Sequence, residues 1–97
     1  MTINTTQDGT KLTFALEGRL DTTTAAMLDE KVSTLDGITD LTLDLEKLEY
    51  MSSAGLRVLL AAQKIMNKQG KMVIKNVNET INEVFEITGF SDVLTIE

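Results

Sequence analysis

Two side chains on which many enzymes and metal sites depend are missing from this 97-residue chain, which has no cysteine and no histidine. Without cysteine the chain can form neither disulfides nor thiolate metal sites. Without histidine it lacks the commonest general base, the usual partner of a catalytic serine and the commonest metal ligand. We therefore expect a protein that is not an enzyme, with no catalytic residue and no metal site.

Aromatic residues are also scarce, at 4% of the chain, and the net charge at pH 7 is −6. An acidic surface with few aromatic rings disfavours binding to nucleic acid or to anionic lipid. No apolar run approaches the ~20 residues of a membrane span, and no charged-then-apolar leader opens the chain. We expect a cytoplasmic protein that does not bind nucleic acid and does not insert into a membrane.

Loops that bind nucleotide phosphates are absent too. The sequence contains neither G-x-x-x-x-G-K-S/T nor G-x-G-x-x-G, so we expect no cofactor. The 42% of residues that are apolar suffice for one core, and the length suits a single domain over residues 1–97.

Alternation of apolar and polar residues predicts several strands. Asp8-Gly9 is a two-residue turn signal between the first two of them, so the chain should open with a β-hairpin. We expect residues 46–50 to form a polar connection and the last segment to be a strand or a docked tail. The expected strands are 2–6, 11–17, 40–45, 72–74 and 93–96.

Apolar residues recur at helical spacing in three further segments. The first should start at Asp21 or Thr22 as its cap and run to Leu35. The second should run from Ser53 to about residue 69 and stop at Gly70. The third should run over 78–88, with Asn78 as its cap, Ile87 in its apolar set and a stop at Gly89.

The resulting order is β-β-α-β-α-β-α-β, which places the chain in the α/β class. The β-α-β stretches require parallel pairing with right-handed crossovers, and the hairpin adds an antiparallel edge. We expect a mixed sheet, an N-terminal hairpin plus parallel βαβ units, with helices packed on it.

The stretch Tyr50-Met51-Ser52-Ser53-Ala54-Gly55-Leu56 places two serines where a loop turns into the second helix. One interpretation is that Ser53 caps the helix by accepting a hydrogen bond from a backbone N–H. The other is that the same position is a phosphorylation site, since a helix N-terminus presents free N–H groups and partial positive charge. The small residues Ala54 and Gly55 would let a partner approach the backbone. The two interpretations are compatible.

A nucleophilic role for Ser53 is not expected. The elbow pattern G-x-S-x-G is absent, and Lys64 would lie about three helical turns away from the hydroxyl. Arg57, Lys64 and Lys68 share one helical face. They are either a solvated stripe or a basic ridge that steers an acidic partner toward Ser53.

Asp21 and the threonines 22–24 form a second polar cluster, which is either a helix cap or part of a site. Both this cluster and Ser53 follow a strand and begin a helix, so they should lie at the same end of the sheet. Ligands of open sheets bind at such ends.

These motifs together resemble the STAS domain of anti-sigma factor antagonists over nearly the whole chain. The resemblance is carried by Gly18-Arg19-Leu20-Asp21, by Leu43-Asp44-Leu45 leading to the serine motif, and by Phe85-x-x-x-Gly89-Phe90. It implies a STAS-like mixed sheet with helices packed on it.

The resemblance also implies a function. Such an antagonist binds an anti-sigma factor that is also a serine kinase, and so frees the sigma factor. The kinase phosphorylates the serine two places before the glycine, here Ser53, which ends binding, and a serine phosphatase restores it. The resemblance places Asp21 on the partner surface, and we expect the full set of partner-binding residues to be Asp21, Thr22, Thr23, Ser52, Ser53, Ala54, Gly55 and Arg57.

In one position the chain departs from the best-studied antagonists, which have aspartate immediately before the phosphorylated serine. Ser52 stands there, so Ser52 is an alternative phosphorylation site. STAS domains also occur in membrane transport systems. The alternative function is therefore an accessory subunit of a transport assembly, for example one that moves lipid, without phosphorylation.

Overall fold

A computed structural model describes all residues 1–97, and its element order confirms the predicted α/β class up to the last element. The hairpin, the two β-α-β units and the three helices are all present. The elements are β1 (Thr2–Asp8), β2 (Lys11–Leu20), α1 (Ala25–Val32), β3 (Asp40–Met51), α2 (Ser53–Gln69), β4 (Lys71–Lys75), α3 (Glu79–Thr88) and a short 3₁₀ helix, η1 (Phe90–Asp92).

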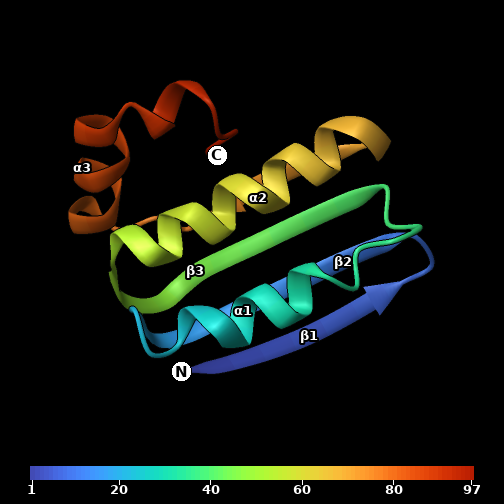
Figure 1. The fold of residues 1–97 in the computed structure, drawn as a ribbon, viewed down its shortest axis with the longest axis horizontal. Coiled ribbons are helices and arrows are strands. Elements are labelled where there is room, and N and C mark those ends of the chain that lie inside the picture. Colours follow the sequence, from blue (N-terminus) through green and yellow to red (C-terminus); the bar gives the residue numbers. More distant parts are fainter.

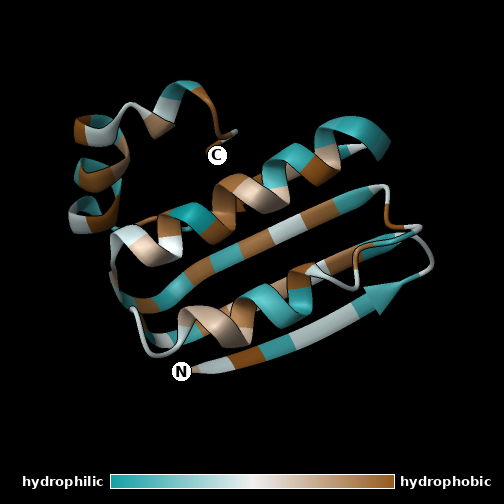
Figure 2. Cartoon of the chain, in the orientation of Figure 1, coloured by the Kyte–Doolittle hydropathy of each residue, from teal (hydrophilic) through white to brown (hydrophobic).

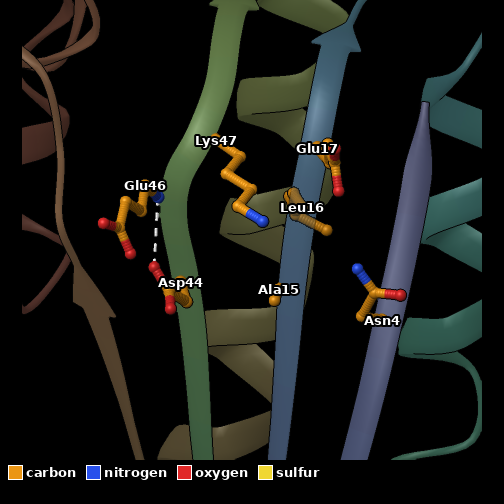
Figure 3. Close-up of a pocket in the computed structure, with 7 residues that line it drawn as sticks. All are labelled: Asn4, Ala15, Leu16, Glu17, Asp44, Glu46 and Lys47. Atoms are coloured by element: carbon orange, nitrogen blue, oxygen red, sulfur yellow. Dashed lines mark hydrogen bonds between the residues drawn. The ribbon is translucent and has the colours of Figure 1, made fainter.

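The four strands form one mixed sheet in the order β1-β2-β3-β4. β1 is antiparallel to β2, whereas β2, β3 and β4 run parallel to one another. Figure 1 shows α1 and α2 lying side by side across one face of the sheet, with α3 beyond α2. The opposite face of the sheet is left without a helix, as the close-up in Figure 3 shows.

The predicted alternation of apolar residues is confirmed on the strands. Leu12, Phe14 and Leu16 of β2 are buried, and so are Leu41 and Leu43 of β3. They belong to one core of 24 buried residues between the sheet and the helices. In Figure 2 hydrophobic and hydrophilic bands alternate along β3, since successive side chains point to opposite faces.

The polar connection predicted over residues 46–50 is wrong, because β3 continues through it to Met51. Two irregularities in the pairing of β2 with β3 explain the error. Each adds one residue to β3: first between the pairs Ala15–Asp44 and Glu17–Lys47, then between Gly18–Leu48 and Arg19–Tyr50. Each such bulge resets the alternation of side chains, so the pattern of a strand is lost although the strand goes on.

Three further boundaries differ from the prediction. α1 begins at Ala25 and ends at Val32, and a turn carries the chain on to Leu35, which stays buried. Ile87 of α3 is exposed instead of buried. The predicted last strand is reduced to a single bridge between Ile74 and Ile96 that follows η1, so the docked tail was the correct alternative.

The ends of α2 and α3 confirm the prediction more closely. α2 runs from Ser53 to Gln69, and the N–H of Gly70 donates to the carbonyl of Met66 at 2.7 Å. The side chain of Asn78 caps α3 by accepting from the N–H of Ile81 at 2.8 Å. No helix combines the length and apolar character needed to cross a bilayer.

Candidate functional site

The two polar clusters predicted from the sequence lie at the same end of the sheet, where the parallel strands β2 and β3 end and helices α1 and α2 begin (Figure 1). The N–H of Ser52 donates to the carbonyl of Leu20 at 2.8 Å, which joins the two strand ends directly. The loop before α1 and the start of α2 are therefore neighbours.

The cap of α2 is Ser52 and not Ser53, contrary to the prediction. Ser52 has an extended backbone, and its hydroxyl accepts from the N–H of Gly55 at 3.4 Å. Ser53 is the first helical residue and is exposed. Its hydroxyl has no hydrogen-bond partner within the chain, so it is free to react or to meet another molecule.

Gly55 is buried, which corrects the expectation that it leaves the backbone open to a partner. A Cβ atom on Gly55 would lie 2.6 Å from Cγ of Leu20 and 3.2 Å from Cγ of Met51. Only glycine lets the first turn of α2 approach the ends of β2 and β3 this closely. Gly55 thereby fixes where Ser53 stands, while Ala54, which is half-buried, lies between them.

Asp21 organises the turn before α1 but is not its cap. Its Oδ1 accepts from the N–H of Thr23 at 3.0 Å, from the hydroxyl of Thr23 at 2.7 Å and from the N–H of Thr24 at 3.1 Å. The hydrogen bond from the Thr23 hydroxyl is the main cause that holds the pKa of Asp21 below its ordinary value. The cap position belongs to Thr24, whose side chain makes no capping bond, while Thr22 and Thr23 are exposed.

Arg19 and Tyr50 complete this end of the sheet, and neither was predicted as a site residue. The second bulge places them opposite each other, with Cζ of Arg19 4.4 Å from the centroid of the Tyr50 ring. Nε of Arg19 is also 3.9 Å from Oδ2 of Asp21. Tyr50 is 40% exposed. The motif Gly18-Arg19-Leu20-Asp21 was visible in the sequence, but the pairing was not, since Tyr50 was expected in a connection.

The predicted basic face of α2 is exposed at Arg57, Lys64 and Lys68, and none of the three forms an ion pair within the chain. Arg57 also lines a shallow groove of about 260 Å³ between α1 and α2. The other residues of this groove are Ala25, Ala26, Asp29, Val58 and Ala61.

A separate depression of about 240 Å³ lies on the helix-free face of the sheet (Figure 3). Asp44 borders it, and its Oδ1 accepts from the N–H of Glu46 at 3.1 Å and from Nδ2 of Asn76 at 2.9 Å. The bond from Asn76 is the main cause that lowers the pKa of Asp44. Asp44 therefore holds the first bulge of β3 in shape. No group of three or more acidic side chains lies close enough to hold a metal ion.

Comparison with known proteins shows which family the chain resembles. The model of the STAS domain matches residues 2–97. The "Putative anti-sigma factor antagonist BtrV" of Bordetella bronchiseptica is 38% identical over 88 residues, which cover 88% of this chain and 76% of that protein. The anti-sigma-B factor antagonist of Staphylococcus aureus is 31% identical over 99 residues, which cover 99% of this chain and 92% of that protein.

Among solved structures, the Bacillus anti-sigma factor antagonist SpoIIAA has the same fold. Its unphosphorylated form superimposes with a TM-score of 0.79 at 20% identity and covers 99% of this chain and 87% of its own. Its phosphorylated form gives a TM-score of 0.78 at 20% identity, with 99% and 91% covered. The family match, the two relatives and this shared fold agree: the chain belongs to the STAS domain family.

Proposed function

We propose that the chain is an anti-sigma factor antagonist that works by partner switching. In its unphosphorylated form it binds an anti-sigma factor that is also a serine kinase, and so frees the sigma factor. Phosphorylation of Ser53 by that kinase ends the binding, and a serine phosphatase reverses it. Two relatives whose names describe anti-sigma factor antagonists, at 38% and 31% identity, support the general role.

The observation that carries the proposal is the division of labour between the two serines. The Ser52 hydroxyl is occupied in capping α2, whereas the Ser53 hydroxyl is exposed and has no partner within the chain. A kinase needs an accessible hydroxyl, so these contacts favour Ser53 over Ser52 as the modified residue. SpoIIAA, which shares the fold, is also known in a phosphorylated form.

The position of Ser53 explains how phosphorylation would act without unfolding the chain. A phosphate on the first residue of α2 adds about −1.5 to −2 charge beside free N–H groups and the positive end of the helix dipole, which tolerate it. A partner docked over the same residues would face a new charge that must be desolvated or repelled. The fold stays intact while the surface changes.

The surface that would meet the partner surrounds Ser53. We assign to it the exposed or half-exposed members of the predicted set, together with the stacked pair Arg19 and Tyr50. Gly55 is buried, so it would shape this surface through its packing against Leu20 and Met51 and would not contact the partner itself. The contacting residues of the predicted set are Asp21, Thr22, Thr23, Ser52, Ser53, Ala54 and Arg57.

Phosphorylation mapping tests the proposal. The full chain is incubated with ATP and candidate serine kinases of its organism, and the modified residue is identified by mass spectrometry. We expect one phosphate, on Ser53, which Ser53→Ala abolishes and Ser52→Ala leaves in place. A phosphate on Ser52 would make the capping serine the modified residue. If no kinase that binds the chain phosphorylates it, the proposal is contradicted.

A further inference from the structure

The negative charge of the chain is concentrated in its last segment. Residues 1–75 carry ten acidic and nine basic side chains, so that part is nearly neutral. Residues 76–97 carry five acidic side chains and no lysine or arginine. None of these five takes part in an ion pair, because the two ion pairs of the chain are Arg19–Asp21 and Lys71–Asp40. The segment that holds α3 and η1 is thus an uncompensated acidic surface.

The outer face of α3 combines this charge with exposed apolar side chains. Ile81 and Phe85 are buried and define the inner face of the helix. Glu79, Glu83 and Glu86 follow at spacings of four and three, which places them in one stripe on the surface.

A second stripe runs beside the acidic one at the same spacing, through Thr80, Val84 and Ile87. Ile87 is 85% exposed, and Val93, just beyond η1, is 50% exposed.

Glu79 in the first turn suits the helix dipole, and Glu86 accepts a hydrogen bond from Nδ2 of Asn82 at 3.2 Å, but the rest of this surface does not benefit the isolated fold. An isoleucine left in water forgoes the stabilisation that burial of such a side chain contributes. Glu86 lies near the C-terminal end of α3, where the helix dipole disfavours negative charge, and the last turn holds no basic residue to offset it. The exposed side chain of Ile87 beside the acidic stripe offers both apolar contact and negative charge to another molecule.

We propose that Glu83, Glu86 and Ile87 on the outer face of α3, together with Val93 just beyond η1, form a docking surface that is separate from Ser53 and binds a basic amphipathic helix of a partner protein. The aliphatic side chains of that helix pack on Ile87 and Val93, and its lysines or arginines lie opposite Glu83 and Glu86. This surface goes beyond the partner switch, which needs only the residues around Ser53.

Charge complementarity selects this occupant over the others. A second copy of the chain docked through the same face would bring two uncompensated acidic surfaces together, which costs free energy. Nucleic acid and anionic lipid are repelled for the same reason. A basic partner gains attraction at a distance and apolar contact when docked, so its binding weakens as salt is raised.

The test is an NMR titration of the full ¹⁵N-labelled chain with a synthetic helical peptide of lysine and leucine whose leucines lie on one face. A matched peptide has alanine in place of each leucine and the same charge. We expect the largest amide shifts in residues 83–93, and binding by the leucine peptide about tenfold tighter than by the alanine peptide.

Matched variants separate the two contributions. Ile87→Ser should weaken binding of the leucine peptide about tenfold. Glu83→Gln with Glu86→Gln should reduce both the affinity and its dependence on salt. Met27→Ser removes another partly exposed apolar side chain, on α1, and should change nothing. Ser53→Ala should also leave peptide binding unchanged, so the result does not depend on the partner switch.

Three outcomes would overturn the proposal. Shifts of equal size at the exposed acids Asp29 and Glu30 of α1 would show attraction by charge alone. Equal binding of both peptides would show that Ile87 and Val93 take no part. Shifts in residues 83–93 that depend on protein concentration without peptide would make a second copy the occupant.

Discussion

The starts of α1 and α2 lie at the same end of the sheet but are held in place by different forces. Packing seats α2, since Gly55 lies tightly against Leu20 and Met51 and Ser52 caps the helix. Hydrogen bonds to one carboxylate, that of Asp21, hold the turn before α1.

The difference explains which polar group is free to act. At α1 the Oδ1 atom of Asp21 already accepts hydrogen bonds from Thr23 and Thr24, which hold the turn. At α2 buried contacts and Ser52 do the structural work, so the Ser53 hydroxyl stays without a partner. Three substitutions, two of them paired with a matched variant, test this comparison, and those that should destabilise the chain most come first.

Gly55→Val should have the largest effect on stability. Its Cβ would lie 2.6 Å from Cγ of Leu20, and relieving that overlap requires α2 or Leu20 to move. We expect a loss of about 2 kcal/mol in the free energy of unfolding, measured by urea denaturation. An unchanged or increased stability would show that packing does not seat α2.

Ser52→Ala should have an intermediate effect. It removes the side chain that accepts from the N–H of Gly55, and loss of such a cap costs about 1 kcal/mol. Ser53→Ala is the matched control one residue away and should change stability by less than about 0.5 kcal/mol. If the two variants were equally unstable, Ser53 would share the capping role.

Asp21→Asn should change mainly how stability depends on pH. The folded chain holds the pKa of Asp21 below its unfolded value, so the ionised carboxylate contributes stability at neutral pH. That contribution is lost as the pH falls from the unfolded pKa through the lower folded pKa. The variant should therefore lose less stability than the parent when urea denaturation is repeated at decreasing pH.

Asp44→Asn is the comparison for that experiment, because hydrogen bonds lower the pKa of Asp44 in the same direction at the first bulge of β3. Each variant should retain the acid-dependent loss that comes from the other aspartate. An acid profile of Asp21→Asn identical to that of the parent would show that ionisation of Asp21 contributes nothing to folding.

Much of the fold could be predicted from the sequence because local patterns and burial agree there. The alternation at Leu12, Phe14 and Leu16 predicted a half-buried strand, and Asn78 predicted the start of α3. The extension of β3 could not be predicted, since its bulges are set by pairing with β2. Ile87 has helical spacing but no neighbour to cover it, and spacing alone does not reveal that.

The sequence correctly placed the two polar clusters at one end of the sheet, but it did not predict the contacts within them. The sequence placed two serines at the start of α2. Which of them accepts the capping hydrogen bond depends on where the backbone changes from extended to helical, and that change follows Ser52. The sequence also contained Gly55, but its burial follows from the position of Leu20 on another strand. The pairing of Arg19 with Tyr50 likewise depends on contacts between strands.

In the proposed switch, a phosphate on Ser53 ends binding while the fold stays intact. Its most direct test is a calorimetric titration of the serine kinase that modifies the chain, with the unphosphorylated and the Ser53-phosphorylated full chain in parallel. We expect binding by the unphosphorylated form and at least tenfold weaker binding by the phosphorylated form, about 1.4 kcal/mol or more, with both forms equally folded. Equal affinity of the two forms would contradict it.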